Sequence, residues 1–110
     1  MDLDRIAKLL HQRQRNHSLP QPFYNDPEIL AFDLDAVFAT SWLLAGFEAE
    51  VPEPGSAMTF AAGRSSVIIA RDRDGQLRAF HNTCRHRGSE LLAEGCRKVS
   101  RLTCPYHQWT

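Results

Sequence analysis

The chain has 110 residues, and its 13 lysines and arginines balance 13 aspartates and glutamates, so the formal net charge is zero. This length suits one domain at most, with only about two thirds of the unfolded surface buried on folding. The balanced charge favours neither a nucleic acid nor a membrane surface as partner. No apolar run is long enough for a signal peptide or a membrane span. Three cysteines suit a reducing cytoplasm better than a secreted disulfide scaffold, so a cytoplasmic location is expected.

The first forty residues are expected to contain two helices. From residue 2 to about residue 15, apolar side chains recur at helical spacing with charges on the other face, which predicts an amphipathic helix. Residues 18–24 contain Pro20 and Pro22, which lack an amide proton and disfavour helix in the residue before them. This segment is therefore expected to be an extended connector.

A second helix is predicted from about residue 27 to residue 38. Asp26 can cap it, and Pro27 suits its first position because proline has no N–H to leave unpaired there. Its apolar residues recur at i, i+4, i+7 and i+8. This stripe is expected to pack against the rest of the domain and consists of Leu30, Leu34, Val37 and Phe38.

Beyond Trp42 the apolar pattern changes to that of strands. An Asp-Gly turn signal lies in residues 72–75, between two segments expected to pair as a hairpin. Residues 89–93 are expected to form one helical turn. The fold class is therefore mainly β (α+β), with small antiparallel sheets after two N-terminal helices. The expected strands cover residues 41–48, 57–61, 67–71, 77–80 and 99–102.

Two short clusters of cysteine and histidine carry the candidate chemistry, CRH at 84–86 and CPYH at 104–107. Residues at i and i+2 of an extended backbone point to opposite faces, so Cys84 and His86 would need a tight turn to bind one tetrahedral ion. They suit two adjacent metals better. With Cys84 and Cys104 on one iron and His86 and His107 on the other, the ligand set is that of a Rieske 2Fe-2S cluster.

A structural zinc site is the competing interpretation, because zinc uses the same two cysteines and two histidines in tetrahedral geometry. Zinc sites of this composition usually space their ligands as C-x2-4-C and H-x3-5-H. Neither spacing occurs here, so the pattern favours the iron-sulfur cluster.

The strings HNTCRHRGSELL and CPYHQWT resemble the two cluster loops of Rieske non-haem iron oxygenase alpha subunits, C-x-H, seventeen residues, C-x2-H. Three further strings resemble more narrowly the members that oxidise quaternary amines such as glycine betaine and choline. These strings are SLPQPFYNDPEIL, SWLLAGFEAEVPEPGS and VIIARDRDGQLRAFHNTCRHRGSELL. The resemblance runs from about Ser18 to Thr110. It implies a helical segment over residues 1–40 and a Rieske 2Fe-2S domain over residues 41–110.

The resemblance also implies partners. Oxygenases of this family take electrons from a reductase or ferredoxin, are usually trimeric, and activate oxygen at a mononuclear Fe(II) held by two histidines and one carboxylate. The sequence shows no such triad, so the chain is expected to be C-terminally incomplete and to pass single electrons toward an iron in a catalytic domain or neighbouring subunit. A stand-alone Rieske-type ferredoxin or a non-catalytic metal-binding module is the alternative. Family ferredoxins lack a forty-residue helical prelude, which favours the oxygenase.

Respiratory-chain Rieske proteins differ from this sequence near both loops. Their disulfide-bonded cysteines correspond here to Ser89 and Tyr106, so no such bridge can form. Their Gly-Ser after the second histidine is replaced by Gln108 and Trp109, which removes a hydroxyl that would hydrogen-bond the cluster. Because such hydrogen bonds tune the reduction potential, the sequence predicts the low end of the Rieske range of roughly −150 to +300 mV.

Other residues near the two clusters have less specific roles. Arg85 and Arg87 flank His86, where they are either steering groups for an acidic electron donor or simply solvated. Cys96 is not needed as a ligand and is expected to be an idle thiol. Tyr106 and Trp109 are expected to pack around the cluster.

Overall fold

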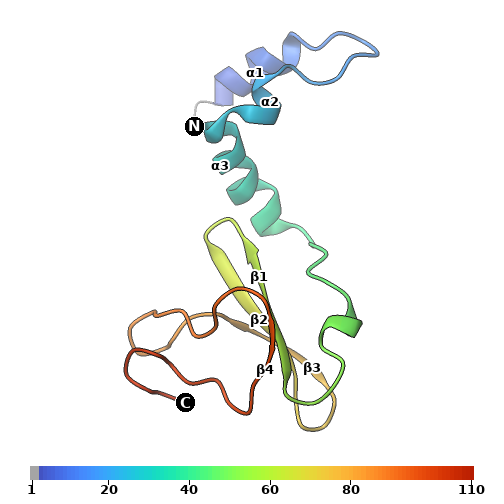
Figure 1. The fold of residues 1–110 in the computed structure, drawn as a ribbon. Helices are drawn as coiled ribbons and strands as arrows, with labels where there is room; N and C mark the ends of the chain where they lie inside the picture. Colours follow the sequence, from blue (N-terminus) through green and yellow to red (C-terminus); the bar gives the residue numbers. More distant parts are fainter. Residues whose placement is uncertain (1–2) are drawn as a thin grey trace. The chain divides into compact units, whose positions relative to one another are not determined.

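The structure, a computed structural model, describes residues 3–110 and contains two compact units, Met1–Leu43 and Leu44–Thr110. Within the described residues the first unit is helical, and the second is built on a four-stranded antiparallel sheet (Figure 1). This confirms the predicted fold class. None of the helices in residues 3–110 has the length and apolar character needed to cross a membrane.

The helical unit contains α1 (Leu3–His11), α2 (Pro22–Asn25) and α3 (Pro27–Ala36). The first helix ends four residues earlier than predicted, and its expected start at residue 2 lies outside the described part. The helix α2 corrects the prediction of an extended connector. Pro22 stands at its first position, where the missing N–H removes no helical hydrogen bond and the fixed φ favours a turn.

The predicted cap of α3 is present. The Asp26 carboxylate accepts a hydrogen bond of 2.9 Å from the Glu28 backbone N–H. Arg5 forms salt bridges with Asp26 and Glu28, the latter at 3.0 Å, and so ties α1 to the start of α3. The side chain of Arg5 and the capped N–H lower the pKa of Asp26.

The predicted buried face of α3 is wrong. Ile29 is its one buried residue, whereas Leu30, Val37 and Phe38 of the expected stripe are exposed. Apolar residues occupy more than one face of this helix, as its sequence PEILAFDLDA shows. Spacing alone therefore could not select the face that its neighbours cover.

The strand expected over residues 41–48 is also absent. This segment is a loop followed by the 3-10 turn η2 (Glu48–Glu50), and Trp42, Leu44 and Phe47 are exposed. An apolar run becomes a strand only where a neighbouring strand can pair with its N–H and C=O groups, and none does here. Instead, the Glu50 carboxylate accepts the Phe47 N–H at 2.7 Å and closes the turn.

The sheet has the order β3-β2-β1-β4 with antiparallel neighbours. Three of its strands match predicted ones, and β1 and β2 form a hairpin that turns at Gly63, with φ of 60° (Figure 1). Asp72 accepts N–H groups in the predicted turn between β2 and β3. The strands are β1 (Ser56–Ala62), β2 (Ser65–Arg71), β3 (Leu77–His81) and β4 (Cys96–Lys98).

The fourth strand lies at Cys96–Lys98 and not at 99–102, and residues 89–93 form no helical turn, which corrects two predictions. β4 pairs with the start of β1, with Lys98 opposite Ser56. The last bond of this pairing joins the Val99 N–H to the Gly55 carbonyl at 2.7 Å. The register of β4 is thus set by β1, which is distant in sequence.

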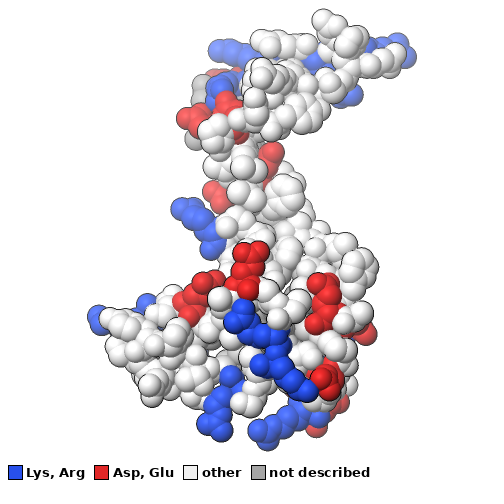
Figure 2. Space-filling model, in the orientation of Figure 1, with Lys and Arg blue, Asp and Glu red and all other residues white. Residues whose placement is uncertain are grey.

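The core of the second unit is small. Ile68 and Ala57 from the sheet and Val51 from the preceding turn are fully buried, and Cys84 and Cys104 are buried as well. Figure 2 shows acidic and basic side chains interspersed on the visible face, in keeping with the zero net charge.

Candidate metal centre

Two loops carry the four candidate ligands and have the same hydrogen-bonding pattern. In the first, the Cys84 N–H donates to the Ser89 carbonyl at 2.7 Å, and the Gly88 N–H donates to the Cys84 carbonyl at 2.8 Å. In the second, the Cys104 N–H donates to the Trp109 carbonyl at 2.7 Å, and the Gln108 N–H donates to the Cys104 carbonyl at 2.9 Å. Each cysteine therefore closes its own loop through the residues four and five positions later. The two loops lie side by side at the end of the chain (Figure 1).

The fourth residue after each cysteine has a left-handed backbone. It is Gly88 in the first loop, with φ of 75°, and Gln108 in the second, with φ of 61°. Glycine adopts this conformation without steric cost, whereas a residue with a Cβ is strained there. Gly88 therefore forms its turn without strain, whereas Gln108 takes the same loop geometry at a strained φ.

All four candidate ligands come together. The Cys84 and Cys104 thiols are both buried, and Cys84 is near enough to influence the pKa of Cys104. The imidazole rings of His86 and His107 meet edge to face with centroids 4.8 Å apart, and both residues are exposed. The sulfurs thus lie inside the unit while the imidazoles reach its surface.

The Cys104 sulfur lies among hydrogen-bond donors. The backbone N–H groups of His107 and Tyr106 are the main ones, and the side chains of Cys84 and Ser89 add to them. These donors lower the pKa of the Cys104 thiol, against the opposing effect of burial. A lowered pKa favours the thiolate, which is the form that binds metal.

Aromatic rings cover the two histidines. The Trp109 indole stacks on the His86 ring with centroids 4.6 Å apart and planes within 7° of parallel. The Tyr106 ring lies over His107 at 3.9 Å. The prediction that these two aromatic residues pack around the site is confirmed.

Asn82 holds both ends of the first loop and was missed by the sequence analysis. Its side chain is buried, with Nδ2 donating to the Leu92 carbonyl at 2.7 Å and to Ser66 Oγ at 3.1 Å. Its Oδ1 accepts the backbone N–H groups of Leu91 at 3.0 Å and Leu92 at 2.9 Å. The sequence does show a polar residue between a predicted strand and a ligand motif. It could not show which groups Asn82 bonds to, because these partners lie up to sixteen residues away.

The third cysteine and a histidine shortly before the first loop lie outside the centre. Cys96 is an exposed free thiol on β4, and His81 is exposed at the end of β3. Within residues 3–110, no three His, Cys, Asp or Glu side chains converge on one ion position. A binuclear cluster does not require three, because each of its irons takes two protein ligands.

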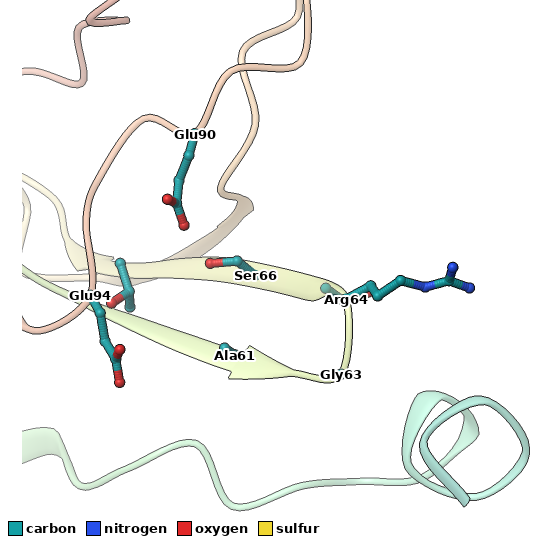
Figure 3. A pocket seen from close by; sticks show the side chains of 8 residues that line it. Ala61, Gly63, Arg64, Ser66, Glu90 and Glu94 are labelled. Carbon is teal, nitrogen blue, oxygen red and sulfur yellow. The ribbon is translucent and has the colours of Figure 1, made fainter. Parts of the chain in front are cut away.

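A cavity of about 280 Å³ lies beside the β1–β2 hairpin. Glu90 and Ser66 line it, while Arg64 extends outward from the hairpin tip (Figure 3). The Glu90 carboxylate accepts a hydrogen bond of 3.2 Å from Asn82 Nδ2. This cavity therefore adjoins the Asn82 network and contains none of the four candidate ligands.

The fold and the site together define a small antiparallel β domain in which two equivalent loops present two thiols and two imidazoles. The family model of the Rieske 2Fe-2S domain matches residues 41–110. The chain belongs to the Rieske 2Fe-2S domain family, and the Rieske-type 2Fe-2S cluster is the cofactor of that family.

Curated relatives are oxygenase subunits. The glycine betaine monooxygenase oxygenase subunit of Chromohalobacter salexigens is 48% identical over 107 residues, which cover 97% of this chain and 24% of that protein. The chloroplastic choline monooxygenase of Amaranthus tricolor is 39% identical over 82% of this chain and 20% of its own length. The chain therefore spans about a quarter of the length of the curated relatives it matches.

Solved structures show the same fold. Naphthalene 1,2-dioxygenase from Rhodococcus sp. superposes with a TM-score of 0.80 and 30% identity over 96% of this chain and 24% of its own. A quaternary ammonium Rieske monooxygenase in complex with L-carnitine gives a TM-score of 0.70 and 37% identity over 82% of this chain and 26% of its own. These matches confirm the resemblance drawn from the loop motifs and the Rieske oxygenase fold.

The donor set of this chain fits the family cofactor. Two buried thiols, one with a lowered pKa, lie beside two imidazoles at the surface. A Rieske cluster requires two thiolates on one iron and two imidazoles on the other.

Trp109→Ala is expected to shorten the lifetime of the cluster in excess chelator by about five-fold, since an aromatic stack contributes roughly 1 kcal/mol. The decay of the visible absorbance measures it. Trp42→Ala is the matched control, because Trp42 is fully exposed, at 104% relative exposure, and should leave the lifetime unchanged. Equal lifetimes of the two variants would show that the stack on His86 does not protect the site.

Proposed function

We propose that Cys84 and Cys104 bind one iron, and His86 and His107 the other iron, of a Rieske 2Fe-2S cluster. Such a cluster accepts and releases one electron at a time. The observation that carries the assignment is the meeting of two buried thiols with two surface imidazoles across loops of matching geometry. The third cysteine, Cys96, is exposed on β4.

The residues of the chain have separate tasks in this function. The N–H groups of His107 and Tyr106 favour the thiolate of Cys104, and burial of both cysteines excludes water from the sulfur side. The exposed imidazoles of His86 and His107 provide the surface through which an electron enters or leaves. Asn82 and the two loop closures hold the ligands in place before metal binds, which limits rearrangement on electron transfer.

We further propose that this Rieske domain, over residues 41–110 and preceded by the helical segment 1–40, serves a quaternary-amine monooxygenase. The support is the identity to glycine betaine and choline monooxygenases, proteins that act on the amines in their names. In this proposal a reductase or ferredoxin supplies electrons in a cytoplasmic, multi-subunit, usually trimeric enzyme. The two histidines and one carboxylate for a mononuclear Fe(II) belong to a catalytic domain or neighbouring subunit outside residues 3–110.

The cofactor assignment is tested on anaerobically purified protein. Iron and acid-labile sulfide are expected in equal amounts, with a Rieske-type EPR signal after reduction. The measured potential is expected at the low end of the range of roughly −150 to +300 mV. Bound zinc without labile sulfide would contradict this proposal and indicate a structural zinc site instead.

A further inference from the structure

The residue five positions after each cysteine closes its own loop and also contacts the other loop. In the first loop, the Ser89 carbonyl accepts the Cys84 N–H at 2.7 Å. In the second, the Trp109 carbonyl accepts the Cys104 N–H at 2.7 Å, and the indole crosses to stack on His86 at 4.6 Å. The Ser89 side chain crosses the other way and lies among the hydrogen-bond donors around the Cys104 sulfur. The loops therefore exchange contacts, one at an imidazole and one at a sulfur.

Ser89 lies where the interior of the site meets its surface. It is half-buried, whereas Gly88 and Glu90 on either side are exposed and Cys104 is buried. The bond between its carbonyl and the Cys84 N–H fixes its backbone at the base of the first loop. A hydrogen bond in such low-dielectric surroundings is electrostatically stronger than one in water. The contact between the hydroxyl and the sulfur is thus internal to the site.

The donors around the Cys104 sulfur differ in what a substitution can remove. Two are the backbone N–H groups of Tyr106 and His107, which remain with any side chain other than proline. The Cys84 side chain is a third, but a cysteine loses its proton when it binds metal. Of these four groups, the Ser89 hydroxyl is therefore the side-chain donor that remains in the loaded site, and Ser89 is not itself a candidate ligand.

A hydrogen bond to a metal-bound sulfur affects the two redox states of a cluster unequally. One added electron makes the cluster and its sulfur ligands more negative, and hydrogen bonds to a charged acceptor are roughly twice as strong as neutral ones. Such a bond therefore stabilises the reduced state more than the oxidised state. Hydrogen bonds to the sulfurs accordingly help to set the reduction potential of an iron-sulfur cluster.

We propose that Ser89 is a positioning residue that donates its hydroxyl hydrogen bond to the Cys104 sulfur and thereby raises the reduction potential of the cluster. The cluster gains or loses one electron, and the proton stays on the Ser89 oxygen. This inference rests on the proposed cluster, and it adds the residue that adjusts its potential. The potential of the unaltered protein remains at the low end of the Rieske range, and without the hydroxyl it falls further.

Spectroelectrochemical titration of the cluster-loaded protein tests the inference. Ser89→Ala is expected to lower the equilibrium constant for reduction about ten-fold, which corresponds to about 59 mV for a one-electron couple. Ser89→Thr keeps the hydroxyl and should restore most of that loss. Ser100→Ala is the matched control, because it removes the same group from an exposed position between β4 and the second loop, and it should leave the potential unchanged.

Resonance Raman spectroscopy gives a readout that a merely structural role of Ser89 would not change. A sulfur that loses a hydrogen bond binds iron more strongly, so the iron–sulfur stretching frequency should rise in Ser89→Ala. The shift of this band on transfer to D₂O should be smaller in Ser89→Ala than in the unaltered protein and should return in Ser89→Thr. Spectra and potentials are normalised to the EPR signal, so a variant that loads poorly still reports on its loaded fraction.

A Ser89→Ala protein with the potential of the unaltered protein would overturn the inference, and so would equal losses in Ser89→Ala and Ser89→Thr. If Ser89→Ala held no cluster at all, a crystal structure of the unaltered, loaded protein would decide. It is expected to place Ser89 Oγ within hydrogen-bonding distance of the Cys104 sulfur, and a hydroxyl turned away from that sulfur would contradict the inference. Absence of the Rieske EPR signal in the unaltered protein is a different outcome, since it would remove the proposed function itself.

Discussion

His107→Cys is expected to lower the reduction potential of the centre by on the order of 200 mV. An anionic thiolate would replace a neutral imidazole on one iron and stabilise the oxidised cluster, moving the centre toward the potential of about −400 mV of all-cysteine plant-type ferredoxins. His86→Cys should act in the same direction, because His86 and His107 lie ring to ring in the structure. Spectroelectrochemical titration of the purified variants measures the change.

Control substitutions separate ligands from other residues of the same type. Cys96→Ser should retain full iron and sulfide, because Cys96 is exposed on β4, whereas Cys104→Ser should lose the cluster. His17→Cys, in the helical unit, should leave the potential unchanged. A cluster-bearing His107→Cys protein with an unaltered potential would mean that His107 is not a ligand.

Asn82→Ala is expected to reduce the free energy of unfolding by about 2–4 kcal/mol. The substitution would leave the N–H groups of Leu91 and Leu92 and the Leu92 carbonyl without their partner. An unpaired buried group costs roughly 1–3 kcal/mol, and because these three are only partly buried, each is expected to cost about 1 kcal/mol. Urea unfolding followed by circular dichroism measures the change. Cluster content after reconstitution should fall in parallel, because Asn82 spans both ends of the first ligand loop.

Two further variants sharpen this result. Asn82→Asp keeps the acceptor for the N–H groups of Leu91 and Leu92 but loses the donor, and it places a second carboxylate beside Glu90. It should therefore be destabilised too. Asn25→Ala, at an exposed position, should have little effect. An Asn82→Ala protein with an unchanged unfolding midpoint would show that other contacts hold the loop.

Short-range patterns predicted a large part of the structure. The Asp26 cap, the turn at residues 72–75 and the strands on either side of that turn follow from residues within a few positions of one another. The four candidate ligands were also predicted as a set. Their residue types and short spacings favour a cluster with two sulfur and two nitrogen ligands over a zinc site, before any fold is known.

The remaining features depend on contacts between distant segments. Apolar residues lie on several faces of α3, so the sequence did not indicate that Ile29 would be its buried residue. Residues 41–48 were apolar enough for a strand, but no neighbouring strand pairs with them. The register of β4 required β1, some forty residues earlier in the chain.

The sequence by itself determined the candidate ligand set, the family and the strands on either side of the turn at residues 72–75, because these depend on residue identity and local spacing. Only the tertiary structure decided how the ligands are held. Asn82 bonds to Ser66 and Leu92, and the two loops present their thiols inside and their imidazoles outside. Buried polar groups must find partners wherever the folded chain brings them, and no local pattern identifies those partners.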